Sequence, residues 1–227
     1  MALGLIGCGS GSDAPVPATP APTTQSSEAT TTEATSATGA RVVILGTSLT
    51  AGLGVAPEEA YPAVLQRLAD SAGFPVRIVN AGLSGETSAG ALRRVEWLLQ
   101  EAPALLIIET GANDGLRGVD PDSTAANLRG IVARVRAAHP GVPIALVQME
   151  APPNLGPAYT TRFRAVFGDV ARTEQLTLLP FLLERVAGVP ALNQADGIHP
   201  TPEGAELAAR TLWPTLVPLL RSLSISR

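Results

Sequence analysis

The sequence predicts an α/β protein, a three-layer α/β/α sandwich around a five-stranded, mostly parallel sheet, and two patterns carry this prediction. Short continuous apolar runs recur along the chain, which is typical of strands that helices cover on both faces. Amphipathic stretches of helical length separate these runs, and strict alternation of strand and helix implies right-handed crossovers between parallel strands. The expected domain spans residues 41–227, a length that suits a single domain.

Five apolar runs are the expected strands. The first, residues 41–45, reads Arg-Val-Val-Ile-Leu, is rich in β-branched side chains and ends at a glycine. The other four follow in order along the chain: residues 75–79, 104–108, 143–147 and 176–179. The first three strands run directly into polar, glycine-rich strings. Because ligands of open parallel sheets bind outside the carboxyl ends of the strands, we expect a site at this edge.

Five amphipathic stretches are the expected helices. Four of them are residues 57–72, 88–101, 123–138 and 159–173. The last begins at Thr201-Pro202-Glu203, because Thr201 is a suitable N-cap and proline favours the first helical position. Since proline lacks a backbone N–H, Pro214 and Pro218 are expected to end or kink this helix.

The N-terminal part differs in composition. Residues 9–40 are dominated by Ser, Thr, Pro, Ala and Gly and predict a disordered tether, because they offer too little apolar surface for a core. Ahead of them, Leu5-Ile6-Gly7-Cys8 resembles a bacterial lipobox, in which the cysteine is lipidated. We interpret residues 1–8 as part of a lipoprotein signal whose beginning lies upstream. The alternative is a flexible N-terminus whose thiol has no special role.

The lipobox also predicts a location. It favours the bacterial cell envelope, periplasmic or anchored to the membrane through a lipidated Cys8, over a secreted or cytoplasmic protein. No other segment approaches the roughly 20 apolar residues of a transmembrane helix.

Composition excludes several classes of function. All sixteen positively charged residues are arginine, so a Schiff-base enzyme, a Ser-Lys dyad and a Walker phosphate loop are excluded for want of a lysine. A net charge of -4 without a basic run argues against nucleic acid as a partner. One cysteine and two histidines exclude a disulfide framework and make a metal site unpromising. We expect neither a metal nor a cofactor.

One of the two histidines is a candidate for proton transfer. Histidine is the side chain that most readily takes and returns a proton near neutral pH. His199 stands three residues after Asp196 in the string Asp-Gly-Ile-His-Pro, whereas His139 precedes Pro140 where a helix is expected to end. His199 is therefore the expected base.

Ser48, directly after the first strand, is the matching nucleophile. A serine becomes nucleophilic when a neighbouring base removes its proton, which His199 could do. Asp196 would bond the far ring nitrogen of the histidine and stabilise the imidazolium. The oxyanion of a tetrahedral intermediate needs donors placed in advance, and the backbone N–H groups of Ser48 and Gly85 and the amide of Asn113 could supply them.

In this order, the blocks resemble those of the SGNH hydrolases, also called GDSL esterases. They are Gly46-Thr47-Ser48-Leu49, Gly85, Gly111-Ala112-Asn113-Asp114 and Asp196-Gly197-Ile198-His199-Pro200, and the resemblance covers Arg41 to Leu220. It implies a flavodoxin-like fold and a serine esterase that hydrolyses carboxylic esters or thioesters through an acyl-enzyme. The loops look closest to the bacterial lysophospholipase, acyl thioesterase and arylesterase branch.

The chain departs from the family at Thr47, where members typically carry aspartate. Threonine keeps a hydroxyl but loses the charge, so the hydrogen bonds behind the nucleophile are expected to change. We expect tuning of the rate rather than inactivity, because the proton-transfer groups lie elsewhere. Glu109 is expected to end its strand by bonding nearby backbone.

Two loops are expected to wall the acyl pocket of a monomeric enzyme acting on a small-molecule ester or thioester. They contribute Leu116 and Arg117 after the asparagine block, and Pro153, Asn154 and Leu155 after the fourth strand. Their apolar content favours a short or medium acyl chain. Alternatively, the proline-rich loop only connects two elements.

Three other functions stay open. One is a carbohydrate O-acetylesterase of the same fold, and another is a catalytically weak, surface-anchored binding module. The third is a phosphate or flavin binder whose loop at residues 46–52 would hold an anion at a helix N-terminus. This last reading leaves Asn113, Asp196 and His199 without a role.

Overall fold

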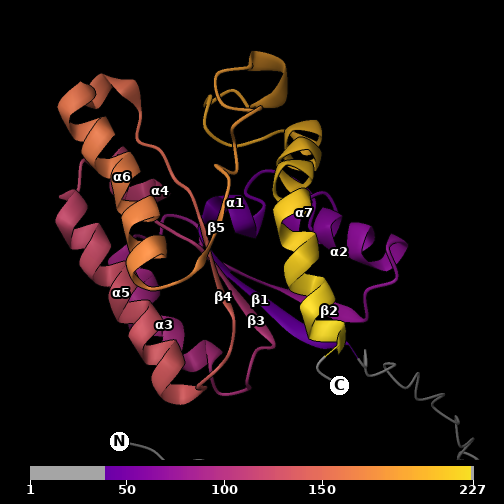
Figure 1. Cartoon of the computed structure of the whole chain (residues 1–227). Helices are drawn as coiled ribbons and strands as arrows, with labels where there is room; N and C mark the ends of the chain where they lie inside the picture. Colours follow the sequence, from indigo (N-terminus) through magenta and orange to yellow (C-terminus); the bar gives the residue numbers. More distant parts are fainter. Residues whose placement is uncertain (1–38, 226–227) are drawn as a thin grey trace, which may run out of the picture. The chain divides into compact units, whose positions relative to one another are not determined.

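A five-stranded sheet lies between two layers of helices in the computed structural model, which describes residues 39–225 (Figure 1). The strand order is β2-β1-β3-β4-β5, and all neighbouring strands of this sheet are parallel. The strands are β1 (Ala40–Gly46), β2 (Val76–Gly82), β3 (Leu105–Glu109), β4 (Ile144–Val147) and β5 (Thr177–Leu179). The predicted α/β class and its five-stranded sheet are confirmed.

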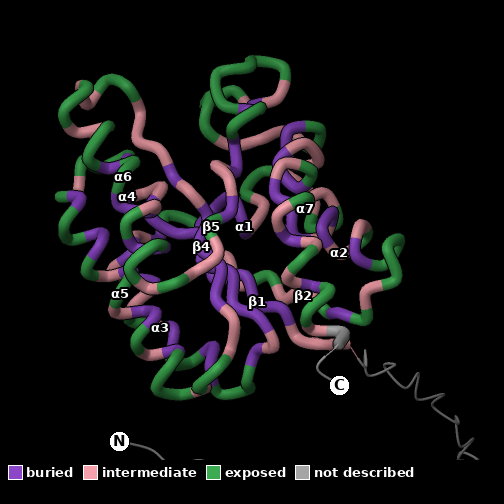
Figure 2. The backbone as a smooth tube through the Cα atoms, viewed as in Figure 1, coloured by how far each residue is buried: buried purple, intermediate pink, exposed green. Residues whose placement is uncertain are grey.

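Five longer helices form the outer layers. Helices α2 (Tyr61–Ser71) and α7 (Pro202–Ile225) pack together on one face of the sheet. The opposite face carries α3 (Ser88–Leu98), α5 (Pro121–Ala138) and α6 (Pro157–Thr173), as Figure 1 shows. In Figure 2 the central strands β1, β3 and β4 are mostly buried, while the outward faces of the helices are exposed. Each helix therefore contributes one apolar face to the core, as its amphipathic pattern predicts.

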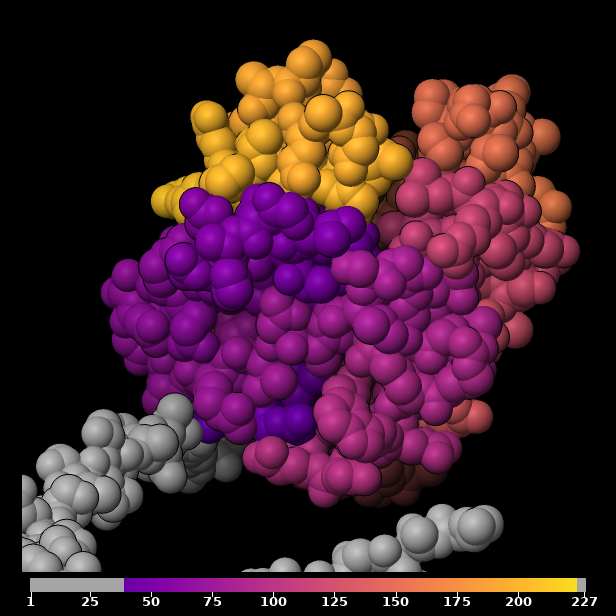
Figure 3. Space-filling model, turned by 180° about the vertical axis from the view of Figure 1, so that it is seen from behind, coloured from indigo at the N-terminus to yellow at the C-terminus, as the bar shows by residue number. Residues whose placement is uncertain are grey.

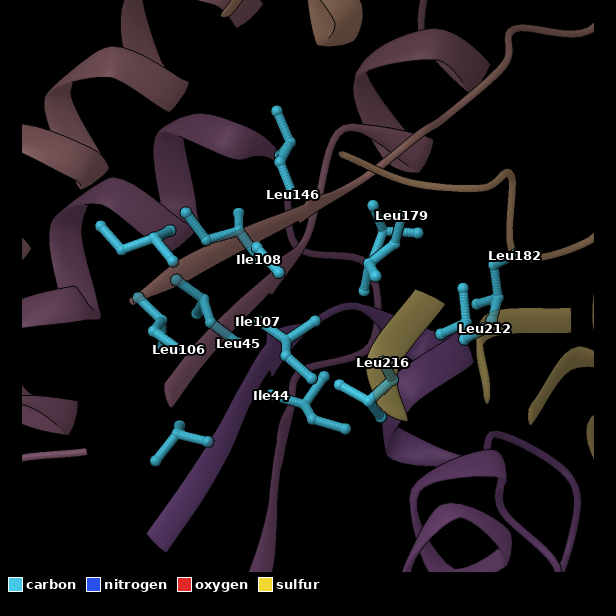
Figure 4. Packing of buried hydrophobic residues seen from close by; sticks show 14 of the residues in the cluster. Ile44, Leu45, Leu106, Ile107, Ile108, Leu146, Leu179, Leu182, Leu212 and Leu216 are labelled. Atoms are coloured by element: carbon cyan, nitrogen blue, oxygen red, sulfur yellow. The ribbon is translucent and has the colours of Figure 1, made fainter. Parts of the chain in front are cut away.

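The strand interiors alternate between the two layers. Ile44 of β1 pairs with Ile107 of β3, and both point towards Leu216 of α7 (Figure 4). Their neighbours Leu45 and Ile108, also paired in register, turn to the other face. All five side chains are fully buried, so both faces of the central strands are covered.

Of the two outcomes predicted for Pro214 and Pro218, an end of the helix is excluded, because α7 continues through both prolines to Ile225. A proline inside a helix costs roughly 3 kcal/mol. Leu212, Leu216 and Leu220 lie at helical spacing across the two prolines and are fully buried. Their burial against the sheet outweighs the local cost. The start of α7 is as predicted, with the Thr201 hydroxyl accepting a hydrogen bond from the N–H of Gly204.

Other boundaries differ from the predicted ones by a few residues. The expected helix at 57–72 begins at Tyr61, after a turn, and the expected helix at 88–101 ends at Leu98. Four short helices were not predicted, because three to five residues are too few to show a helical period. They are α1 (Ser48–Ala51), α4 (Ala112–Leu116), η1 (Pro153–Leu155) and η2 (Pro190–Leu192).

The predicted lipobox at residues 1–8 lies outside the described residues, and so does the predicted tether except for its end, since Ala40 already belongs to β1. Within residues 39–225, no helix combines the length and the apolar character that a membrane span requires.

Candidate active site

The predicted site residues gather at the carboxyl edge of the sheet. Ser48 follows β1, Gly85 follows β2, Asn113 follows β3, and Asp196 with His199 lies in the loop before α7. The chain passes from β1 to β2 on one side, whereas β3, β4 and β5 follow on the other side. A crevice forms at such a switch point in open α/β sheets.

Ser48 and His199 are in hydrogen-bond contact although 151 residues separate them. Ser48 is the first residue of α1, and its Oγ lies 2.9 Å from His199 Nε2. The Ser48 residue is only 8% exposed, because α1 turns back over the end of the sheet. The hydroxyl and the imidazole therefore meet at a partly closed point where a proton can pass between them.

Asp196 holds the other side of the imidazole. Its Oδ2 lies 2.6 Å from His199 Nδ1, and its Oδ1 accepts the backbone N–H groups of Ile198 and His199. The hydrogen bond from the His199 side chain, supported by these two N–H groups, lowers the pKa of Asp196 to about 2. The carboxylate stays charged at neutral pH and can stabilise a protonated imidazole.

Three groups around the site can donate a hydrogen bond to a substrate oxygen. In residues 39–225 neither the N–H of Ser48 nor that of Gly85 donates to another group, so both are available. Asn113 Nδ2 gives one hydrogen to the carbonyl of Glu86, at 3.1 Å, and keeps its second hydrogen free. Gly85 has a φ of 77°, a left-handed conformation that glycine adopts without strain. These groups have the chemistry of an oxyanion hole.

Two arginines hold the glycine loop in place. Arg117 Nη2 donates to the carbonyl of Gly85 at 3.1 Å. Arg94 forms an ion pair with the buried carboxylate of Glu86 and also donates to the carbonyls of Gly46 and Ala81. The loop after β2 is thereby tied to the ends of β1 and β2.

An apolar pocket of about 340 Å³ opens beside Ser48 and Asn113. Of the residues predicted to wall it, Leu116 and Pro153 line the pocket, whereas Arg117, Asn154 and Leu155 lie outside its lining. The opposite wall is formed by residues that the sequence interpretation missed, namely Phe181, Leu183, Ala187, Asn193 and Ile198. Several of them follow the end of β5, so the strand-end rule that located the other loops could have found them.

Figure 3 shows the two walls as separate lobes with a notch between them. One lobe is formed by the segment around residues 150–160 and the other by the segment around residues 180–200. These two segments contribute Pro153 and Phe181 to the lining of the pocket beside Ser48.

A buried carboxylate lies behind the nucleophile. Glu109 is fully buried at the end of β3 and accepts the backbone N–H of Thr47 at 2.9 Å. The hydroxyls of Thr47 and Thr50 also donate to it, at 3.0 and 2.6 Å. The hydroxyl of Tyr61 bonds Thr50 in turn. Burial raises the pKa of Glu109 to about 7, although its hydrogen bonds act in the opposite direction. Thr47 thus donates two hydrogen bonds to this carboxyl, one from its backbone and one from its hydroxyl. An ionised aspartate at this position could donate only through its backbone N–H.

The remaining candidates have structural contacts. His139 Nε2 bonds the carbonyl of Leu99, which fixes the end of α5 against the loop after α3. Asp114 accepts hydrogen bonds from Ser88 and Thr124 and joins α4 to α3 and α5. Over residues 39–225, no three His, Cys, Asp or Glu side chains come together as a metal site would need.

Comparison with known proteins gives a consistent result. The model of the GDSL-like Lipase/Acylhydrolase family matches residues 44–207. The chain is 45% identical over 181 residues to Esterase TesA of Pseudomonas aeruginosa, covering 79% of this chain and 89% of that protein. It is 38% identical over 180 residues to the Escherichia coli protein named Thioesterase 1/protease 1/lysophospholipase L1, covering 79% and 84%.

A solved structure is also similar to this chain. The psychrotrophic esterase EstA from Pseudoalteromonas sp., in a structure inhibited by monoethylphosphonate, has a TM-score of 0.75 and 34% identity. The match covers 80% of this chain and 99% of that one.

Fold and site together define a serine hydrolase of the α/β class. The chain belongs to the GDSL-like lipase/acylhydrolase family, as its four sequence blocks predicted, and it is an ester hydrolase of the esterase and thioesterase type.

Proposed function

We propose that Ser48 is the nucleophile, His199 the general base and Asp196 the residue that orients it in the hydrolysis of carboxylic esters and thioesters. The observation that carries this proposal is the pair of contacts made by one imidazole, 2.9 Å to Ser48 Oγ and 2.6 Å to Asp196 Oδ2. Both lie within the reach that proton transfer requires.

The geometry supports a two-step reaction. Ser48 Oγ attacks the acyl carbon while its proton passes to His199 Nε2, and the tetrahedral oxyanion forms beside the N–H groups of Ser48 and Gly85 and the free hydrogen of Asn113. Collapse expels the alcohol or thiol, which takes the proton from His199. Water, deprotonated by His199, then attacks the acyl-enzyme, releases the carboxylic acid and restores Ser48.

The pocket supports an acyl group of apolar character. Its walls carry Leu116, Pro153, Phe181, Leu183 and Ile198, and its only charged lining residue within the described chain is Glu150. A carbohydrate acetyl ester would need several polar groups for its sugar hydroxyls, and beyond Ser48 and Asn113 this lining offers only Glu150 and Asn193. We therefore favour esters and thioesters of short or medium acyl chains, the substrate type suggested by the names of the Pseudomonas and Escherichia relatives.

Active-site labelling and a substrate panel test the proposal. Ser48→Ala should abolish both labelling by a fluorophosphonate and hydrolysis of p-nitrophenyl esters, since no other group takes over the attack. Persistent labelling would show that the nucleophile is a different residue. The panel should include esters of graded length, an acyl-CoA and a lysophospholipid. A preference for acetylated sugars would overturn the substrate assignment.

The location and the assembly are also part of the proposal. A lipid on Cys8 would anchor the domain at the bacterial envelope through residues 9–40, and the domain would act as a monomer without nucleic acid. Incorporation of a labelled fatty acid that is lost in Cys8→Ser would support the anchor, and its absence from the unaltered protein would refute it.

A further inference from the structure

The nucleophile and its base lie on two separate segments whose spacing must be kept. We call residues 47–54 the nucleophile turn and residues 193–200 the histidine loop. Residues 195–198 of the histidine loop are exposed, Asp196 among them. Misplacing a reacting group by about 1 Å can cost on the order of 10²-fold in rate. Something beyond the Ser48–His199 contact has to hold these segments together.

The side chain of Gln194 bridges them. Its Nε2 donates to the carbonyl of Leu53 in the nucleophile turn, at 2.7 Å, and to the carbonyl of Pro200 next to His199, at 2.9 Å. Both hydrogens of one amide are thus shared between the two segments. In residues 39–225, the bond to Leu53 is the only hydrogen bond besides Ser48–His199 that joins the nucleophile turn to the histidine loop.

Each end of this bridge is connected directly to a reacting residue. The N–H of Leu53 bonds the carbonyl of Ser48 at 3.1 Å, so the acceptor of Gln194 is tied to the nucleophile itself. On the other side, the backbone N–H of Gln194 bonds the carbonyl of His199 at 2.7 Å. Gln194 therefore bonds both His199, through the backbone, and Pro200, the residue that follows it.

The nucleophile turn is shaped to receive this amide. A Cβ atom at Gly54 would stand 2.1 Å from Gln194 Oε1, so any other residue here would displace the end of the Gln194 side chain. The φ of Gly54 is 80°, which also favours glycine at this point.

We propose that Gln194 is a positioning residue that sets the distance between Ser48 Oγ and His199 Nε2. The inference rests on the proposed roles of these two residues. Gln194 acts on the rate of proton transfer and not on the binding of the acyl group, because it is absent from the lining of the acyl pocket.

Two variants of similar size test the inference. Gln194→Met keeps the volume but donates no hydrogen bond, and Gln194→Glu places a carboxylate beside two carbonyl oxygens. Both should lower kcat for a p-nitrophenyl ester by roughly 10- to 100-fold and slow fluorophosphonate labelling in parallel, while KM changes by less than about twofold. Inhibition by a free fatty acid, which needs no proton transfer, should stay the same.

Gln66 provides a matched control. It is half-buried like Gln194, and its side-chain amide makes three hydrogen bonds, to Asp70, Val76 and Ile78, where that of Gln194 makes two, but it joins α2 to β2 far from the site. Gln66→Met should lower the melting temperature at least as much as Gln194→Met and leave kcat unchanged. A general loss of stability therefore cannot mimic the expected result.

A second route approaches the same contact from Gly54. Gly54→Ala should lower kcat in the unaltered protein, and most of that loss should vanish in a Gln194→Ala background, since the two side chains no longer collide. Folded Gln194 variants with kcat within about twofold of the unaltered protein would overturn the inference, as would fully additive effects of the Gly54 and Gln194 changes. Neither result touches the proposed function, because the nucleophile is tested separately by the labelling of Ser48→Ala.

Discussion

Two carboxyl groups lie on opposite sides of Ser48, and their surroundings differ in almost every respect. Asp196 sits on an exposed loop, bonds the imidazole of His199 and has its pKa lowered to about 2 by that bond. Glu109 is fully buried below the nucleophile turn, bonds the backbone and hydroxyl of Thr47, and has its pKa raised to about 7 by burial.

The difference shows how the surroundings of two carboxyl groups give one a role in the reaction and the other a role in stability. Asp196 remains an anion at neutral pH, next to the ring that becomes positive during the reaction, so it serves the chemistry. The hydrogen bonds of Glu109 go to Thr47 and Thr50, so this carboxyl holds the backbone on either side of Ser48. Asp196 should therefore matter for the rate, and Glu109 for stability and for the shape of the turn.

Removing the charge of Asp196 should give the largest effect. In Asp196→Asn the amide can still accept the N–H groups of Ile198 and His199, but it cannot stabilise the imidazolium. We expect kcat to fall by roughly 10³- to 10⁴-fold, with the melting temperature almost unchanged because the residue is exposed. Steady-state kinetics and thermal unfolding of the same preparation measure both quantities.

Asp70→Asn is the control for this change. Asp70 is also exposed and also accepts a side-chain hydrogen bond, from Gln66, but it lies on α2. It should leave kcat unaltered. If Asp196→Asn lost less than about tenfold in kcat, the imidazole would not depend on this carboxylate. The claim that Asp196 acts on the rate while Glu109 acts on stability would then be wrong.

Truncating Glu109 should give the largest effect on stability. Glu109→Ala removes the acceptor of one N–H and two hydroxyls in a fully buried position. Each buried donor left without a partner costs about 1 to 3 kcal/mol, so the free energy of unfolding should fall by about 3 kcal/mol or more. Urea titration measures the loss.

Glu109→Gln is the control for this truncation. It keeps the shape and most of the hydrogen bonds, and its loss of stability should be much smaller. Equal losses in the two variants would mean that the charge matters more than the acceptor.

The contributions of Glu109 and Asp196 to the free energy of unfolding should change with pH in opposite directions. The folded-state pKa of Glu109, about 7, lies above the ordinary value of 4.5, so the folded state binds more protons between these values. This group's contribution is fully present below pH 4.5 and declines as pH rises to about 7, by about 3 kcal/mol in all. Urea titrations across this range, for the unaltered protein and for Glu109→Gln, isolate the effect as a difference. A difference that does not vary with pH would contradict it.

Asp196 should act in the opposite direction. Its folded-state pKa, about 2, lies below the ordinary value of 3.8, so its contribution is present above pH 3.8 and is lost as pH falls towards 2. The contribution is small because the group is exposed and solvent screens it.

Much of this arrangement could be predicted from the sequence, and the exceptions have physical reasons. Apolar runs in the sequence predict the strands. Ser48, Gly85 and Asn113 each follow a strand closely, and His199 precedes a helix with a clear start signal. Parallel topology brings such loops to one edge whatever the details of packing.

Other features depend on contacts that no local pattern records. Gln194 acquires its position through Leu53, which is 141 residues away. Helix α7 passes two prolines because Leu212 and Leu216 are buried on the sheet. The sequence predicts that Glu109 bonds nearby backbone, but not which residue supplies it: the N–H group belongs to Thr47, 62 residues away in sequence. The structure also gives a role to threonine at position 47, where the family typically has aspartate: its hydroxyl donates to Glu109.

Thr47 offers the smallest and most specific change in the comparison. Thr47→Val keeps the shape and the backbone N–H but removes one hydroxyl donor to Glu109, so the free energy of unfolding should fall by about 1 kcal/mol. The loss of a donor to the charged form should also move the pKa of Glu109 further above about 7. Thr47→Asp should move it in the same direction more strongly, because two neighbouring carboxylates cannot both ionise easily. Urea titrations over a pH series give both quantities.

Thr124→Val separates the pH shift from the loss of a buried hydrogen bond. Thr124 is fully buried and its hydroxyl also donates to a buried carboxylate, that of Asp114, but this pair lies away from Glu109. Its loss of stability should resemble that of Thr47→Val, without a shift in the pH at which the Glu109 contribution declines. Both Thr47 variants should retain ester hydrolysis at neutral pH, because Ser48 and His199 keep their contact. If Thr47→Asp left the pH dependence of stability unchanged, Glu109 would not be the buried group that titrates behind the nucleophile, and the contrast with Asp196 would have to be drawn from another residue.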